Sequence, residues 1–160
     1  MEEIMSSMTK EEIIMELLKQ NDRKKQAGEV FEMSAYVYML ENKLDQMKHE
    51  LVKMRKELCG MKEEQASKTL KKTMSEMVDR VQKLCDEMKQ KLFEVKGDMR
   101  AKATEIVTEF KKGKEALNMV SEFFGVKKKL EKIRDKVRDG IVETDITLAR
   151  IDGFTEEASG

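Results

Sequence analysis

The sequence predicts an all-α protein, an elongated antiparallel three-helix bundle or coiled coil with a short capping N-terminal helix and a helical break near Gly125. Three observations lead to this fold class. Apolar residues recur three and four positions apart over a long stretch, which places them in one narrow stripe along a helix. Charged residues make up 40% of the chain, which is typical of long solvated helices. The chain has no proline, a residue that a long helix does not tolerate in its interior.

The first element that we expect is a short helix over residues 9–20, after a disordered start at residues 1–8. Thr9 and Glu12 form a capping box, in which the threonine side chain accepts a hydrogen bond from the backbone amide three residues later. The apolar face of this helix carries Ile13, Ile14, Leu17 and Leu18. Residues 22–28 are polar and basic, so we interpret them as a connection.

The second element is a long helix at about residues 29–59. A helix with so narrow an apolar stripe is not stable alone in water, so we expect it to pack along other helices. Its stripe consists of Val30, Met33, Val37, Leu40, Leu44, Met47, Leu51, Met54, Leu58 and Met61. Gly60 and the polar residues after it predict a turn that folds the chain back.

The third element is a helix over about residues 67–112, the longest that we expect. Its apolar stripe is expected at Leu70, Met74, Met77, Val81, Leu84, Met88, Leu92, Val95, Met99, Ala103, Ile106 and Phe110. The consecutive four-residue steps through Met88 break the heptad repeat and indicate a locally straight bundle. Further apolar residues on this helix widen the face, which predicts contact with more than one neighbour.

The last two elements are a short apolar helix over residues 114–124 and a final helix over residues 126–152, with a turn near Gly113 before them. The final helix has its own pair of four-residue steps at Ile133, Val137 and Ile141. A turn centred near Gly113 places these steps opposite Met88. We expect the two short helices to cover the C-terminal part of the longest one, and we interpret residues 9–152 as a single domain followed by a disordered acidic tail at residues 153–160.

Composition and motifs exclude several classes of function. Lysine plus arginine equals aspartate plus glutamate at 32 each, so no net charge attracts nucleic acid or a membrane. The single histidine, His49, faces outward, and no phosphate loop or nucleophile motif occurs. We therefore predict no catalytic, cofactor or metal residues, no small-molecule substrate and no membrane association. Cys59 and Cys85 are expected to be free thiols of a cytoplasmic protein, and the 14 methionines are interpreted as soft core packing.

Local charge suggests one candidate interaction patch. Basic residues cluster before and after the predicted phenylalanine-containing hinge. We expect either a protein partner at this end of the bundle or self-association through the unpaired side of the bundle. The patch comprises Lys111, Lys112, Lys114, Phe123, Phe124, Lys127, Lys128, Lys129, Lys132 and Arg134. Nucleic-acid binding is an alternative for the segment from Lys111 to Arg138, although no aromatic residues alternate with its charges.

Three segments also suggest a family: residues 109–117 (EFKKGKEAL), 121–127 (SEFFGVK) and 146–151 (ITLARI). Over about residues 10–156 the chain resembles an uncharacterised family of small helical proteins from gut Clostridia, often carried on integrative mobile elements. The resemblance implies a bacterial accessory protein of a mobile element, and it carries no established active site. The function that we expect is a non-catalytic coiled-coil interaction module. An inhibitor or decoy of a host defence nuclease complex, acting like an anti-CRISPR protein, is the first alternative.

Overall fold

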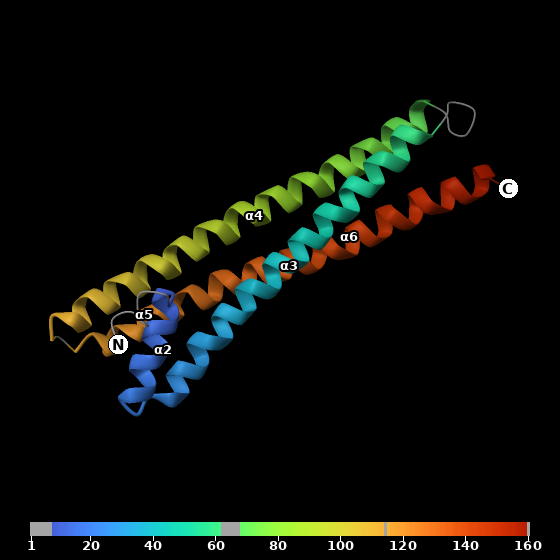
Figure 1. Cartoon of the computed structure of the whole chain (residues 1–160). Helices are drawn as coiled ribbons and strands as arrows, with labels where there is room; N and C mark the ends of the chain where they lie inside the picture. Colours follow the sequence, from blue (N-terminus) through green and yellow to red (C-terminus); the bar gives the residue numbers. More distant parts are fainter. Residues whose placement is uncertain (1–7, 62–67, 114, 160) are drawn as a thin grey trace. The chain divides into compact units, whose positions relative to one another are not determined.

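The computed structural model describes residues 8–61, 68–113 and 115–159. This part of the chain is all-α and contains no strand, which confirms the predicted fold class. The elements are α2 (Lys10–Gln20), α3 (Lys24–Gly60), α4 (Lys68–Lys111), the 3₁₀ segment η1 (Ala116–Met119), α5 (Val120–Phe123), the 3₁₀ segment η2 (Phe124–Val126) and α6 (Lys127–Ser159), as Figure 1 shows.

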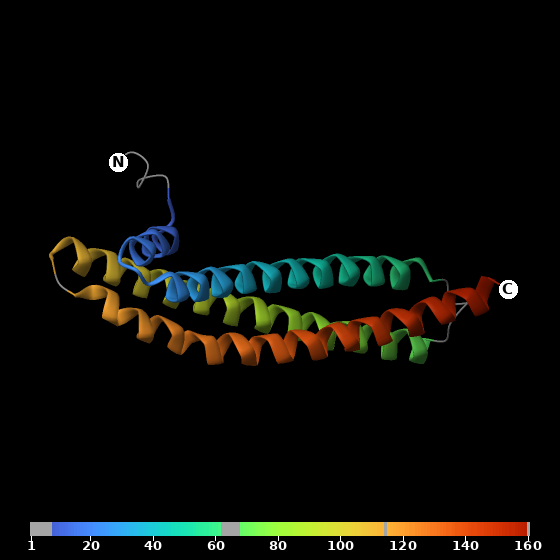
Figure 2. The same ribbon diagram turned by 90° about the horizontal axis from the view of Figure 1, so that it is seen from below.

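The chain divides into two compact units, which are described separately. Unit 1 comprises residues 1–39 and 91–132, and unit 2 comprises residues 40–90 and 133–160. The three long helices α3, α4 and α6 therefore contribute one part to each unit. Unit 1 also contains α2, which lies beside the first turns of α3 (Figure 2).

The predicted apolar stripe of α3 is confirmed, because all ten of its residues are buried. The helix itself begins earlier than expected, at Lys24 instead of residue 29. The reason is a tight turn in which Asp22 adopts a positive φ of 59° and the backbone amide of Arg23 donates to the Leu18 carbonyl at 2.7 Å. This is the Schellman arrangement at a helix end, and it shortens the expected seven-residue connection to three residues.

On α4 the expected stripe is wrong in one stretch. Val78 and Cys85 are fully buried, whereas Met77 and Leu84 are only half-buried. The buried residues from Met74 to Met99 consequently follow a regular heptad, and the predicted irregularity at Met88 is absent. Consecutive four-residue steps occur instead around Met99, between Val95 and Ala103.

On α6, too, some of the residues that point inward are neighbours of the ones that we predicted. After the buried Val126 of η2, the buried positions of α6 are Leu130, Ile133, Val137, Gly140, Thr144, Thr147 and Ile151. Gly140 thus takes the inward position that we assigned to Ile141. The two buried threonines fit because each hydroxyl donates to a backbone carbonyl four residues earlier, at 2.7 Å for Thr144 and 2.8 Å for Thr147.

The register expected between α4 and α6 is nevertheless confirmed within each unit. In unit 2, a Cβ added at Gly140 would lie 3.0 Å from Leu84 Cδ2 and 3.0 Å from Met47 Cε of α3. In unit 1, Lys129 forms an ion pair with Asp98 at 3.4 Å. Both pairs have the sequence positions that a turn near Gly113 requires, and Gly113 has the positive φ of 79° expected for that turn.

The segment between α4 and α6 is a series of short helical turns. The helix expected over residues 114–124 begins at Ala116 and is partly 3₁₀. Near Gly125 the chain passes through the 3₁₀ turn η2 and continues directly into α6. The turn between α2 and α3 contacts this segment in unit 1, since Arg23 donates to the Leu117 carbonyl at 3.1 Å and to Asn118 Oδ1 at 2.9 Å.

The two ends of the chain had been predicted to be disordered. Residues 1–7 lie outside the described part, and so do residues 62–67 of the first turn. At the other end, α6 extends to Ser159, beyond the end that we expected at residue 152. Cys59 is exposed and Cys85 is buried, and both are free thiols as expected.

Candidate functional site

The basic residues of the predicted patch that the structure describes lie at the end of α4 and on α6, and all of them belong to unit 1 except Arg134, which belongs to unit 2. Lys111 and Lys112 are exposed at the end of α4, and Lys127, Lys128, Lys129 and Lys132 are exposed at the start of α6. Successive residues of a helix point about 100° apart, so the three consecutive lysines of α6 face three different directions. The α6 lysines therefore do not form one continuous basic surface.

Some of these cations are paired with acidic side chains. Lys129 lies 3.4 Å from Asp98, Lys112 lies 3.6 Å from Glu109, and the Nε atom of Arg134 lies 3.2 Å from an oxygen of Asp135. Every one of these pairs is at least partly exposed, so each contributes little to stability.

Phe123 does not belong to any surface patch, which corrects the sequence-based prediction. Only 1% of its surface is exposed, because the apolar side of the η1–α5 segment turns into unit 1. Ala116, Leu117 and Val120 are buried from the same segment. Lys114 and the Phe124 side chain lie outside the described part.

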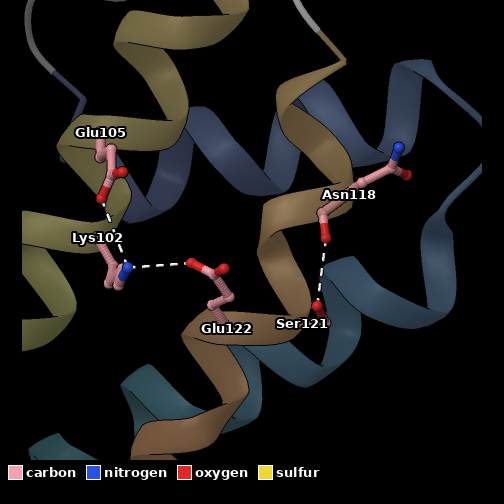
Figure 3. A network of polar contacts seen from close by, with 5 residues as sticks. All are labelled: Lys102, Glu105, Asn118, Ser121 and Glu122. Atoms are coloured by element: carbon pink, nitrogen blue, oxygen red, sulfur yellow. Dashed lines mark hydrogen bonds and ion pairs between the residues drawn. The ribbon is translucent and has the colours of Figure 1, made fainter.

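A shallow groove of about 430 Å³ runs in unit 1 between the end of α4 and the α5–η2–α6 segment. Its central feature is Lys102, whose Nζ donates to Glu122 Oε2 at 3.0 Å and lies 3.5 Å from Glu105 Oε2 (Figure 3). The hydrogen bond to Glu122, together with the charge of Glu105, raises the pKa of Lys102 above its ordinary value. Lys102 therefore links α4 to α5 through its contact with Glu122. A protonated lysine has no free electron pair, so in this state it cannot act as a nucleophile or base.

A second local contact lies within the η1–α5 segment, which also carries Glu122. Ser121 donates from its hydroxyl to the Asn118 carbonyl at 3.2 Å, within the same short helical segment (Figure 3). The remaining lining residues include Asp98 and Lys129, which pair with each other. The charged side chains that line the groove are therefore paired with one another.

Unit 2 contains a pair of carboxyl groups, Glu57 on α3 and Asp152 on α6. Burial, followed by the nearby charge of Asp152, raises the pKa of Glu57 above its ordinary value. Lys53 offsets part of this effect. The pair favours protonation of Glu57, which makes the stability of this unit dependent on pH.

The most unusual surface of unit 1 is one that the sequence-based prediction missed. We call it the outer face of α3, and it consists of Gly28, Phe31, Ala35 and Tyr38. All four residues are exposed, and Phe31 and Tyr38 leave 62% and 66% of their surface open to solvent. Their spacing of three, four and three residues repeats, on the other side of the helix, the spacing of the buried stripe. This second periodic series is visible in the sequence. It was overlooked because the buried stripe of the same helix is longer and more hydrophobic.

Within residues 8–61, 68–113 and 115–159, no group of three His, Cys, Asp or Glu side chains is arranged to hold a metal ion. None of the helices in these ranges is both long enough and apolar enough to cross a membrane.

Comparison with known proteins identifies a family. Residues 10–159 match a family that is described as one of unknown function. No curated protein and no solved structure matches the chain.

Proposed function

The chain belongs to the DUF6674 family of unknown function, and we propose that it is a non-catalytic interaction module that binds a partner helix along the outer face of α3. The observation that carries this proposal is the exposed, uncharged series of Gly28, Phe31, Ala35 and Tyr38. Apolar residues with this spacing form the contact stripe of a helix that packs lengthwise on another helix. Two aromatic side chains that remain mostly exposed in the folded unit are therefore available as binding anchors.

The exposed aromatic area is large enough to support binding. Phe and Tyr side chains each bury about 200 Å² when they are fully covered, so Phe31 and Tyr38 together offer about 250 Å². At about 25 cal/mol per Å², covering this area gives about 6 kcal/mol before the cost of association. That gain supports a weak or transient complex, or a tighter one if the neighbouring residues also make contact.

Site-specific photo-crosslinking tests the proposal. A photoreactive phenylalanine is placed at Ala35 on the outer face, and in a matched control at Lys83, an exposed residue of α4. We expect a defined cross-linked product from position 35 in cells, absent from position 83 and reduced by the double variant Phe31→Ser/Tyr38→Ser. Circular dichroism verifies that the double variant is folded. Equal products from both positions, or none from position 35, would refute the proposal.

The family resemblance extends this proposal to a biological setting. We propose that the protein is an accessory factor of a bacterial mobile element and acts in the cytoplasm. In one version of this role, it binds a host defence nuclease complex as an inhibitor or decoy. Co-expression with candidate defence systems and a plasmid-survival assay test that version, and unchanged plasmid loss would count against it.

Nucleic-acid binding remains the second alternative, supported by the exposed lysines at the start of α6. It predicts retardation of DNA or RNA that weakens steeply as the salt concentration rises. Charge reversal at Lys127 and Lys128 should then abolish the retardation. If the chain fails to retard either nucleic acid at low salt, this alternative is wrong.

A further inference from the structure

We propose that the helix that binds the outer face of α3 is the same helix of a second copy, paired in antiparallel orientation. This inference rests on the proposed function, since it identifies the partner of the same surface. It is carried by the order of residue sizes along the face: Gly28 and Ala35 are small, whereas Phe31 and Tyr38 are large. Small and large residues alternate at successive contact positions.

In an antiparallel pair, the large residues of one copy face the small residues of the other. When two helices pack in opposite directions, each contact layer joins the first apolar position of one heptad with the second apolar position of the other. Phe31 of one copy then lies opposite Ala35 of the other, and Tyr38 lies opposite Gly28. Each aromatic ring thus meets a small residue, which leaves room for it and brings the two backbones close together.

Parallel pairing in register does not achieve this. It places Phe31 opposite Phe31 and Gly28 opposite Gly28, so that crowded layers alternate with empty ones. Both crowding and voids in a packed interface are destabilising. The sequence of the outer face therefore favours the antiparallel arrangement over the parallel one.

The available area sets the expected strength of the dimer. With Met39, which is 37% exposed beside Tyr38, each copy covers about 300 Å² of apolar side-chain area, or about 600 Å² for the two. Backbone and flanking polar groups add to this, which brings the interface near the lower limit of about 1,000 Å² for a specific complex. We therefore expect a dimer that dissociates on dilution.

The orientation can be tested by cysteine cross-linking of the full chain. Cys59 is exposed, so the experiment uses the Cys59→Ser background, with buried Cys85 left in place. In the proposed arrangement the twofold axis passes near residue 33, and the two copies of Glu32 are offset along the helices by only about 3 Å. The two copies of Lys25, on the same flank, are offset by about 24 Å. A short bismaleimide should therefore link Glu32→Cys chains efficiently and Lys25→Cys chains hardly at all.

Light scattering after size-exclusion chromatography provides the second measurement. We expect the mass to rise from 18.6 kDa towards twice that value with concentration. Phe31→Ser/Tyr38→Ser should weaken dimerisation about tenfold or more, whereas Ile146→Ser, which removes an exposed apolar residue of unit 2, should leave it unchanged.

Each outcome decides between the possibilities. Cross-linking at both positions 25 and 32 would indicate parallel pairing and refute the antiparallel arrangement. A chain that stays monomeric and cross-links at neither position overturns the inference. If such a chain still gives a photo-crosslinked product from Ala35, the partner is a different protein and the proposed function stands. If it gives no such product, the proposed function fails as well.

Discussion

Gly140 provides a sharp test of the packing in unit 2. Its missing side chain makes room for Leu84 of α4 and Met47 of α3, each of which would lie 3.0 Å from an added Cβ. Ordinary carbon–carbon contacts are about 3.5–4.0 Å, so an alanine at this position forces both side chains to move. Overpacking of this kind costs about 1–3 kcal/mol, while replacing a helical glycine by alanine gains about 1 kcal/mol.

We therefore expect Gly140→Ala to lower the free energy of unfolding by about 1 kcal/mol. The matched control is Gly97→Ala on α4, where an added Cβ has no atom within 4 Å. This control should raise the free energy of unfolding by about 1 kcal/mol, so the two variants should differ by about 2 kcal/mol. Urea denaturation followed by circular dichroism measures both values.

A double-mutant cycle with Leu84→Ala tests the cause of the effect. Shortening Leu84 removes one of the two crowding atoms, so part of the cost of Gly140→Ala should disappear in that background. The expected coupling is about 1 kcal/mol. If Gly140→Ala stabilises the protein as much as Gly97→Ala does, α3, α4 and α6 do not pack as described in unit 2.

Three further predictions concern single side chains. The raised pKa of Glu57 beside Asp152 means that its protonated form favours the folded state, a contribution present at acid pH and lost as the pH rises through that pKa. Glu57→Gln should therefore stabilise the protein at neutral pH by about 0.5 kcal/mol or less, and less at acid pH, as measured by urea denaturation. Burial raises the pKa of the Cys85 thiol, so an aromatic disulfide reagent should modify Cys59 rapidly and Cys85 only on unfolding. Arg23→Lys keeps the charge but loses the forked donors that contact η1, and hydrogen exchange of α2 should become about tenfold faster.

Control variants with the same type of substitution at other positions test whether these effects are specific to Glu57 and Arg23. Glu50→Gln removes the same charge from another half-buried position of α3 and controls for the loss of a negative charge from this helix. Arg138→Lys makes the same exchange on the exposed side of α6 and should leave α2 protected. Rapid modification of two thiols in the native protein, or equal effects of the paired variants, would contradict these predictions.

The sequence alone determined the fold class and the inner stripe of α3. Ten apolar residues at three- and four-residue steps allow only one buried face, and all ten are buried. The capping residue Thr9 was also predictable, because its hydrogen bond to the amide of Glu12 is local, at 3.2 Å. Local and strictly periodic features depend on few other parts of the chain.

The sequence did not show which of two adjacent residues points into the core when both residues are small or apolar enough to be buried. On α4, Leu84 and Cys85 are adjacent and apolar, and on α6 the choice lay between Gly140 and Ile141. The greater hydrophobicity of Leu84 and Ile141 indicated the wrong member of each pair, because the choice depends on the space that the opposing helices leave. The start of α3 was misjudged for a similar reason, since the turn at Asp22 depends on backbone geometry that its polar composition does not reveal.

The candidate surfaces, too, were predictable from the sequence only in part. The basic residues of α6 were evident from the sequence, but their directions depend on how the helix is turned against α4. The outer face of α3 was present in the spacing from Gly28 to Tyr38, yet only the packed unit shows that these residues are exposed. The sequence determines which helix faces are apolar, and the tertiary structure decides which of them are buried, because burial depends on the shape and position of the neighbouring elements.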